Sequence, residues 1–104
     1  MSAPIIHSPV GRIDGNNAPA LEQELMPKLD GEASGLVLDL QQLDYISSAG
    51  LRVLLMVAKA AKQRGRPFML AQPKPAISDI LKVSGFDKII PTHPTLAAAI
   101  ASLG

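Results

Sequence analysis

Residues 36–65 read LVLDLQQLDYISSAGLRVLLMVAKAAKQRG, a pattern that predicts an apolar strand, a connection and a long helix. In the strand, which we place at 36–40, the three leucines alternate with other residues and therefore share one face. The opposite face carries Asp39, so that face need not be deeply covered. After the connection come Ser47 and Ser48, whose hydroxyl groups can accept hydrogen bonds from the free N–H groups of a first helical turn.

The long helix is expected to run from these serines to about Arg64, where Gly65 ends it. Residues three or four positions apart lie on the same side of a helix. The side expected to face solvent carries Ser48, Arg52, Met56 and Lys59. The side expected to face the core carries Leu51, Leu54, Leu55, Ala58 and Ala61. Since methionine is flexible and apolar, Met56 suits a binding surface.

Strands and helices alternate along the rest of the chain. Pro9 lacks the N–H group that a central strand donates, which limits residues 4–13 to an edge strand. The other expected elements are a helix over 18–29, a connection over 41–46, a strand over 67–71, a helix over 76–84, a strand over 89–90 and a helix over 96–103. This alternation predicts one α/β domain over residues 1–104 whose successive strands are parallel.

Composition excludes several classes of function. The chain has 104 residues and a formal net charge of +1, so no strong field attracts nucleic acid or an anionic membrane. It has no cysteine and two histidines, which rules out a thiol nucleophile and makes a zinc site a poor fit. No segment reaches the ~20 apolar residues of a membrane span, and the N-terminus lacks a secretory-signal pattern. We therefore expect a cytoplasmic protein without a nucleic-acid or membrane partner.

Enzyme motifs are missing from the sequence. The Gly-x-Ser-x-Gly pattern of serine hydrolases fails because Ile46 stands at the first glycine position relative to Ser48. No glycine-rich phosphate loop is present either, so we expect no catalytic residue, no cofactor and no metal. Ser48 can take another role, because phosphorylation would add about 1.5 to 2 negative charges at a helix start, where an anion is tolerated. Such a serine could switch docking without unfolding the domain.

The segment Ile46–Leu51, ISSAGL, resembles the signature of the STAS domain of anti-sigma factor antagonists. Three further segments are similar to that family: GRID at 11–14 with APAL at 18–21, GRP at 65–67, and ILKVSGFDKII at 80–90. Ordered matches over roughly residues 10–103 are more specific than one short motif. The resemblance implies the STAS fold, a mostly parallel sheet of about four to five strands with alternating helices.

The resemblance also implies a partner-switching circuit in which Ser48 takes the phosphoacceptor position. The unphosphorylated family member binds an anti-sigma factor that is also a serine kinase of the histidine-kinase-like ATPase fold, and this releases the sigma factor. Phosphorylation dissociates the complex, and a metal-dependent serine phosphatase of the PP2C type restores the binding form. The residues expected to contact the partner are Asp14, Ser47, Ser48, Arg52, Met56 and Lys59.

Two departures from the family pattern leave alternatives open. Many members have Asp where this chain has Ser47, and many have Gly where it has Arg52. Arg52 follows Ser48 by one helical turn, within reach of a phosphate on that serine. One alternative is a non-switching STAS subunit of a larger assembly, such as a lipid-transport ATPase complex or a stressosome-like sensor. Ser48 could also be an ordinary helix cap, and Asp14 an ordinary turn residue.

Overall fold

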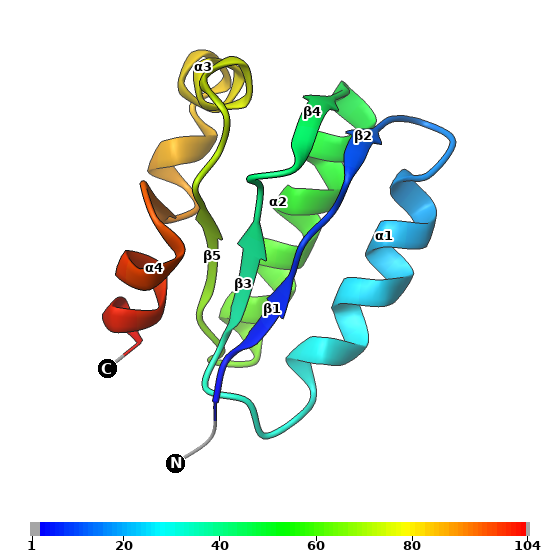
Figure 1. The fold of residues 1–104 in the computed structure, drawn as a ribbon. Coiled ribbons are helices and arrows are strands. Elements are labelled where there is room, and N and C mark those ends of the chain that lie inside the picture. The colour runs from blue at the N-terminus through cyan, green and yellow to red at the C-terminus, as the bar shows by residue number, and fades with distance from the viewer. Residues whose placement is uncertain (1–2, 104) are drawn as a thin grey trace.

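Parallel strands form the centre of the molecule, which we describe from a computed structural model of residues 3–103 (Figure 1). The main sheet has the strand order β1-β3-β5-β6. Its strands are β1 (Ile5–His7), β3 (Leu36–Asp39), β5 (Phe68–Ala71) and β6 (Thr92–His93). A second, two-stranded sheet pairs β2 (Gly11–Ile13) with β4 (Leu43–Ile46). All of these ladders are parallel, which confirms the α/β prediction.

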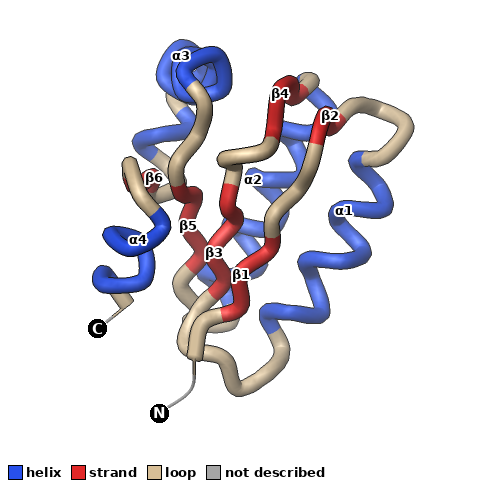
Figure 2. The backbone as a smooth tube through the Cα atoms, in the orientation of Figure 1, coloured by secondary structure: helices blue, strands red, loops and turns tan. Residues whose placement is uncertain are grey.

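Helices lie on both faces of the main sheet (Figure 2). One face is covered by α1 (Ala18–Leu25) and α2 (Ser48–Gln63), and the other by α4 (Leu96–Ser102). The remaining helix, α3 (Pro75–Ser84), packs against β4. Short 3-10 turns follow α1, at Met26–Leu29, and α3, at Phe86–Lys88. The first of these turns contains Pro27, the residue that a regular helix tolerates poorly.

The hydrophobic core has two parts. The larger part fills the space between the main sheet and the α1–α2 layer, where Leu38, Leu54 and Leu70 are fully buried. The smaller part lies under α4 and consists of Val37, Met69, Ala71 and Ala99. The sequence left the cover of the Asp39 face open, and the structure shows that this face lies under α4. Asp39 is only 9% exposed, because the small apolar residues of α4 allow that helix to pack closely on this face.

The expectation of a plain connection over residues 41–46 is wrong, because this segment contains a strand. Leu43–Ile46 forms β4, and its pairing with β2 extends the fold beyond the main sheet. Leu43 and Ile46 are buried while Asp44 and Tyr45 are exposed, so the period of two that identifies a strand is missing. Residues 4–13 likewise form two short strands in place of one, although β1 does lie at the edge of the main sheet as expected.

The strand expected at 89–90 is also wrong. The N–H groups of Ile89 and Ile90 donate to the carbonyl of Phe86 at 3.0 and 2.8 Å. Both residues therefore close the 3-10 turn Phe86–Lys88 and do not pair in a sheet. The last strand, β6, begins after Pro91, whose carbonyl accepts from Leu70 of β5 at 2.9 Å. The two adjacent isoleucines signalled a strand, but only one of them is buried: Ile90 is 1% and Ile89 is 56% exposed.

The buried side of α2 is rotated from the expected one. Its buried residues are Gly50, Val53, Leu54, Val57 and Ala61. Of the expected core residues, Leu54 and Ala61 are buried, whereas Leu51, Leu55 and Ala58 are half-buried. Helix α1 packs against α2, and its buried residues share the larger part of the core with Val53 and Val57.

Candidate functional site

The first turn of α2 separates the roles of its two serines. Ser47 is the N-cap residue, and its Oγ accepts a hydrogen bond from the N–H of Gly50 at 3.2 Å. Ser48 occupies the first helical position and is exposed. Its hydroxyl group has no hydrogen-bond partner among residues 3–103. The capping role therefore belongs to Ser47, and the Ser48 hydroxyl is left accessible to solvent.

The start of α2 is held in place by the second sheet. The N–H of Ser47 donates to the carbonyl of Ile13, the last residue of β2, at 2.9 Å. Residue Ile46, the last residue of β4, is buried next to it. Since parallel strands present their carboxyl ends at the same edge, β2 and β4 together fix the position from which the helix begins.

Asp14 orders the turn between β2 and α1. Its side chain accepts from Nε of Arg12 at 3.1 Å and from the N–H of Asn16 at 3.0 Å. Its carbonyl accepts from the N–H of Ala18 at 2.9 Å, in the first turn of α1. The turn role considered for Asp14 is thus present in the structure. A contact between Asp14 and a partner stays a prediction.

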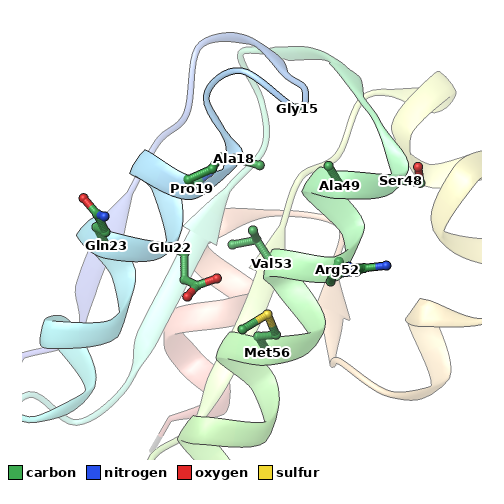
Figure 3. Close-up of a pocket in the computed structure, with 10 residues that line it drawn as sticks. All are labelled: Gly15, Ala18, Pro19, Glu22, Gln23, Ser48, Ala49, Arg52, Val53 and Met56. Carbon is green, nitrogen blue, oxygen red and sulfur yellow. The ribbon is translucent and has the colours of Figure 1, made fainter.

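A groove of about 450 Å³ runs between α1 and α2 (Figure 3). Its lining consists of Gly15, Ala18, Pro19, Glu22, Gln23, Ser48, Ala49, Arg52, Val53 and Met56. In Figure 3, Val53 and Met56 point from α2 toward α1, and Glu22 points back from α1. The end of the Arg52 side chain lies on the side of α2 away from α1, as does the Ser48 hydroxyl group. The groove thus combines apolar walls with charged groups at its borders.

The structure brings together only part of the expected partner-binding set. Ser48, Arg52 and Met56 line one groove and are all exposed. Lys59 is exposed as well, but it lines a different hollow, formed with β5 and the segment before β6. Lys59 lies three residues after Met56, so its place along the helix was predicted correctly, but the neighbouring elements separate it from the Ser48 groove.

Two exposed side chains near the start of α2 were not singled out from the sequence. The guanidinium carbon of Arg12 lies 4.9 Å from the centroid of the Tyr45 ring, a cation–π distance. The two residues are register partners in the β2–β4 ladder, and Tyr45 is 44% exposed. Because β4 was expected to be a connection, its pairing with β2 could not be used to place them together. Next to Tyr45, Asp44 forms an ion pair with Lys74 at the N-terminus of α3.

His7, in the edge strand β1, contacts charged side chains of α1 and of the 3-10 turn that follows α1. Within residues 3–103, His7 contacts Lys28 Nζ at 3.0 Å and Glu24 at 3.3 Å, at the edge strand. Burial, reinforced by the charge of Lys28, lowers the pKa of His7.

No group of three or more metal-ligating side chains occurs in the described part of the chain. None of its helices has the length and apolar character needed to cross a membrane.

The chain is similar in sequence to a known domain family and to several named proteins. The family model for the STAS domain matches residues 3–99. BtrV of Bordetella bronchiseptica, named as a candidate anti-sigma factor antagonist, is 42% identical over 92 residues, covering 88% of this chain and 79% of BtrV. The anti-sigma-F factor antagonist RsfA of Mycobacterium tuberculosis is 30% identical over 104 residues, covering 97% of this chain and 80% of RsfA.

A solved structure supports the same assignment. The crystal structure of an anti-sigma factor antagonist from Mycobacterium paratuberculosis superimposes with a TM-score of 0.87 at 28% identity, covering 99% of this chain and 87% of that one. The sequence matches and the shared fold thus point to the same regulatory class. The chain belongs to the STAS domain family, among the anti-sigma factor antagonists.

Proposed function

We propose that this protein antagonises an anti-sigma factor and that phosphorylation of Ser48 switches the interaction off. The observation that carries the proposal is the exposed Ser48 hydroxyl group at the first position of α2, unpaired within residues 3–103 while Ser47 holds the cap. Relatives named as antagonists of anti-sigma factors support the class of partner. The phosphoacceptor role comes from the family resemblance and is a proposal for this chain.

The division of labour between the serines suits a reversible switch. A phosphate on Ser48 would leave the hydrogen bond between Ser47 and Gly50 intact, so the helix keeps its cap. The added charge, about −1.5 to −2, would lie at the positive end of the helix dipole, where it is tolerated. Phosphorylation would then change the surface that a partner meets while the fold stays the same.

The groove beside Ser48 provides the binding surface in this proposal. Its exposed apolar part includes Met56, which is 39% exposed and would be buried against the anti-sigma factor. A dianion on Ser48 at the border of that contact would have to be desolvated on binding, which weakens the complex. The exposed Arg12–Tyr45 pair extends the surface on the side of the second sheet.

The chain would supply a phosphoacceptor and a docking surface, with the chemistry located in its partners. We infer that the anti-sigma factor is a serine kinase of the histidine-kinase-like ATPase fold, and that a PP2C-type phosphatase removes the phosphate. Such a circuit would operate in the cytoplasm. On this proposal the protein is a regulatory binding module and has no catalytic role.

The binding test compares two charge substitutions at adjacent positions. The Ser48→Ala protein serves as bait to identify the anti-sigma factor from the native host, and calorimetry then measures the affinity of each variant for the purified partner. Ser48→Asp should weaken binding by about tenfold or more, because it places a charge at the contact. Ser47→Asp is the matched control, since Asp also caps helices, and its affinity should stay within about threefold of the wild type.

Two outcomes would overturn the proposal. Equal affinities of the wild type and Ser48→Asp would remove the switch. Capture of a transporter ATPase subunit in place of a kinase would favour the non-switching STAS subunit. A direct check is the intact mass of the protein purified from its own host, where phosphorylation adds about 80 Da and Ser48→Ala abolishes the increment.

A further inference from the structure

A second hollow lies along a different side of α2. Its volume is about 580 Å³, and its walls come from α2, from the start of β5 and from the segment that precedes β6. Its apolar lining includes Leu55 and Ala58 of α2, Pro67 and Phe68 at the start of β5, and Ile89 and Pro91 before β6. A hollow of this size falls within the range of small-molecule binding sites in proteins.

The hollow lies where α2 meets the start of β5 and the segment before β6. Helix α3 packs against β4 and against the 3-10 turn Phe86–Lys88, at one end of the sheet (Figure 1). The space beside α2 is therefore bordered by residues 89–91, which belong to no helix. Ile89 is 56% exposed at this border, and half-buried Leu55 faces the same space from α2.

The charged residues that line the hollow are all cations. Lys59 and Lys62 extend from α2, and Arg66 follows the end of the helix. Nη1 of Arg66 donates to the carbonyl of Ala33 at 2.7 Å, which fixes the arginine at the border. Within residues 3–103, neither lysine is paired with an acidic side chain, and no acidic residue lines the hollow. The site thus has an apolar interior and a positive border.

We propose that this hollow binds a free fatty acid, with the alkyl chain against the apolar walls and the carboxylate near Lys59 and Lys62. An alkyl chain matches walls that carry few polar groups, and a single anionic end matches a border of one sign. A concave site of this volume can hold one alkyl chain. The proposal is independent of the role of Ser48, which lines the other groove.

The test is an NMR titration of the ¹⁵N-labelled full chain with dodecanoate below its micelle concentration. We expect saturable one-site binding, with amide shifts concentrated at residues 55–62, 66–69 and 89–91. The matched control is dodecyltrimethylammonium, which has the same alkyl chain and the opposite charge. Each exposed ion pair contributes only modestly to the binding free energy. With two lysines and one arginine at the border, we expect dodecanoate to bind about tenfold more tightly than dodecyltrimethylammonium.

Two variants locate the effect. The double substitution Lys59→Glu with Lys62→Glu should reverse the preference between the two amphiphiles. Lys82→Glu, at an exposed position on α3 outside the lining, should leave the preference unchanged. All of these lysines are exposed, so the variants should fold, and a thermal unfolding curve confirms it.

Several results would overturn the proposal. Equal affinity for the anion and the cation would mean that the face is merely apolar. Amide shifts centred on the Ser48 groove would exclude a fatty-acid site in this hollow. Binding that does not saturate below the micelle concentration would exclude it as well. Sedimentation of the protein with phosphatidylglycerol vesicles in the absence of dodecanoate binding would indicate a membrane contact in its place.

Discussion

A Cβ atom built on Gly50 would lie 2.7 Å from Cγ2 of Ile13, closer than side-chain carbons approach in folded proteins. It would lie equally close to Cγ1 of Ile46. Since Ile13 ends β2 and Ile46 ends β4, this contact lets the first turn of α2 approach both strands of the second sheet. The glycine in the segment ISSAGL is therefore required by packing, at a position where a helix would otherwise favour alanine.

The first prediction follows from that contact. Gly50→Ala should lower the free energy of unfolding by about 1–3 kcal/mol, because overpacking outweighs the gain of up to about 1 kcal/mol in helix propensity. Urea denaturation measures the change. Gly15→Ala is the matched control, since an added Cβ there meets no atom within 4 Å, and it should change stability by less than about 0.5 kcal/mol. A stabilised Gly50→Ala protein would contradict the close packing described here.

The second prediction separates the two serines by stability alone. Ser47→Ala removes the acceptor of the Gly50 N–H bond and should destabilise the protein by about 0.5–2 kcal/mol. Ser48→Ala removes a hydroxyl group that is exposed and should change stability by less than about 0.5 kcal/mol. Urea unfolding of the two variants in parallel provides the measurement. If Ser48→Ala were the more destabilising change, the cap would belong to Ser48, and a phosphate there would disturb the helix.

Element ends were predictable from the sequence where local chemistry decides them. Ser47 caps α2, and Thr95 caps α4 by accepting from the N–H of Ala98 at 3.0 Å. Gly85 ends α3 with a φ of +79°, a conformation that glycine adopts easily. Each of these signals involves residues only a few positions apart, which is why the sequence alone locates them.

Features that depend on contacts between distant segments were missed. The strand Leu43–Ile46 is stabilised by pairing with β2 and has no alternation of its own. The exposure of Ser48 was correctly predicted, because it depends on its position in a single helix. The expected solvent-facing side of α2 is exposed at Ser48, Arg52, Met56 and Lys59. The sequence could not show that Lys59 lines a different hollow from Ser48, because that depends on the positions of α1 and of the segment before β6.

The third prediction concerns the pH dependence of stability. Burial, together with the neighbouring charge of Lys28, lowers the pKa of His7 in the folded protein below its ordinary value of 6.5, and Glu24 opposes this shift only in part. The unfolded chain therefore takes up this proton at a higher pH than the folded protein. The contribution of neutral His7 to the free energy of unfolding is therefore fully present above about pH 6.5. It is lost as the pH is lowered through the pKa of His7 in the folded protein.

Urea unfolding at a series of pH values between about 5 and 8 tests this relation. His7→Gln should flatten the loss of stability below pH 6.5, because the residue that titrates is gone. His93→Gln leaves His7 and both of its charged neighbours in place and should retain the loss. An unchanged slope in His7→Gln would show that another group causes the acid sensitivity.

The fourth prediction concerns Arg52 and a phosphate on Ser48. The side chains lie one helical turn apart, on the side of α2 away from α1 (Figure 3). A guanidinium group near the phosphate stabilises its dianion and so lowers its second pKa, which is about 6 for an isolated phosphoserine. With phosphoserine installed at position 48 during translation, a ³¹P NMR titration of Arg52→Gln should give a phosphate pKa higher by a few tenths of a unit than that of the parent protein.

The matched control is Lys59→Gln, which also removes one cation from α2 but at the other hollow. It should leave the phosphate pKa unchanged. Because no kinase is involved, the result depends only on the pairing within α2, and identical pKa values in the parent protein and Arg52→Gln would exclude that pairing.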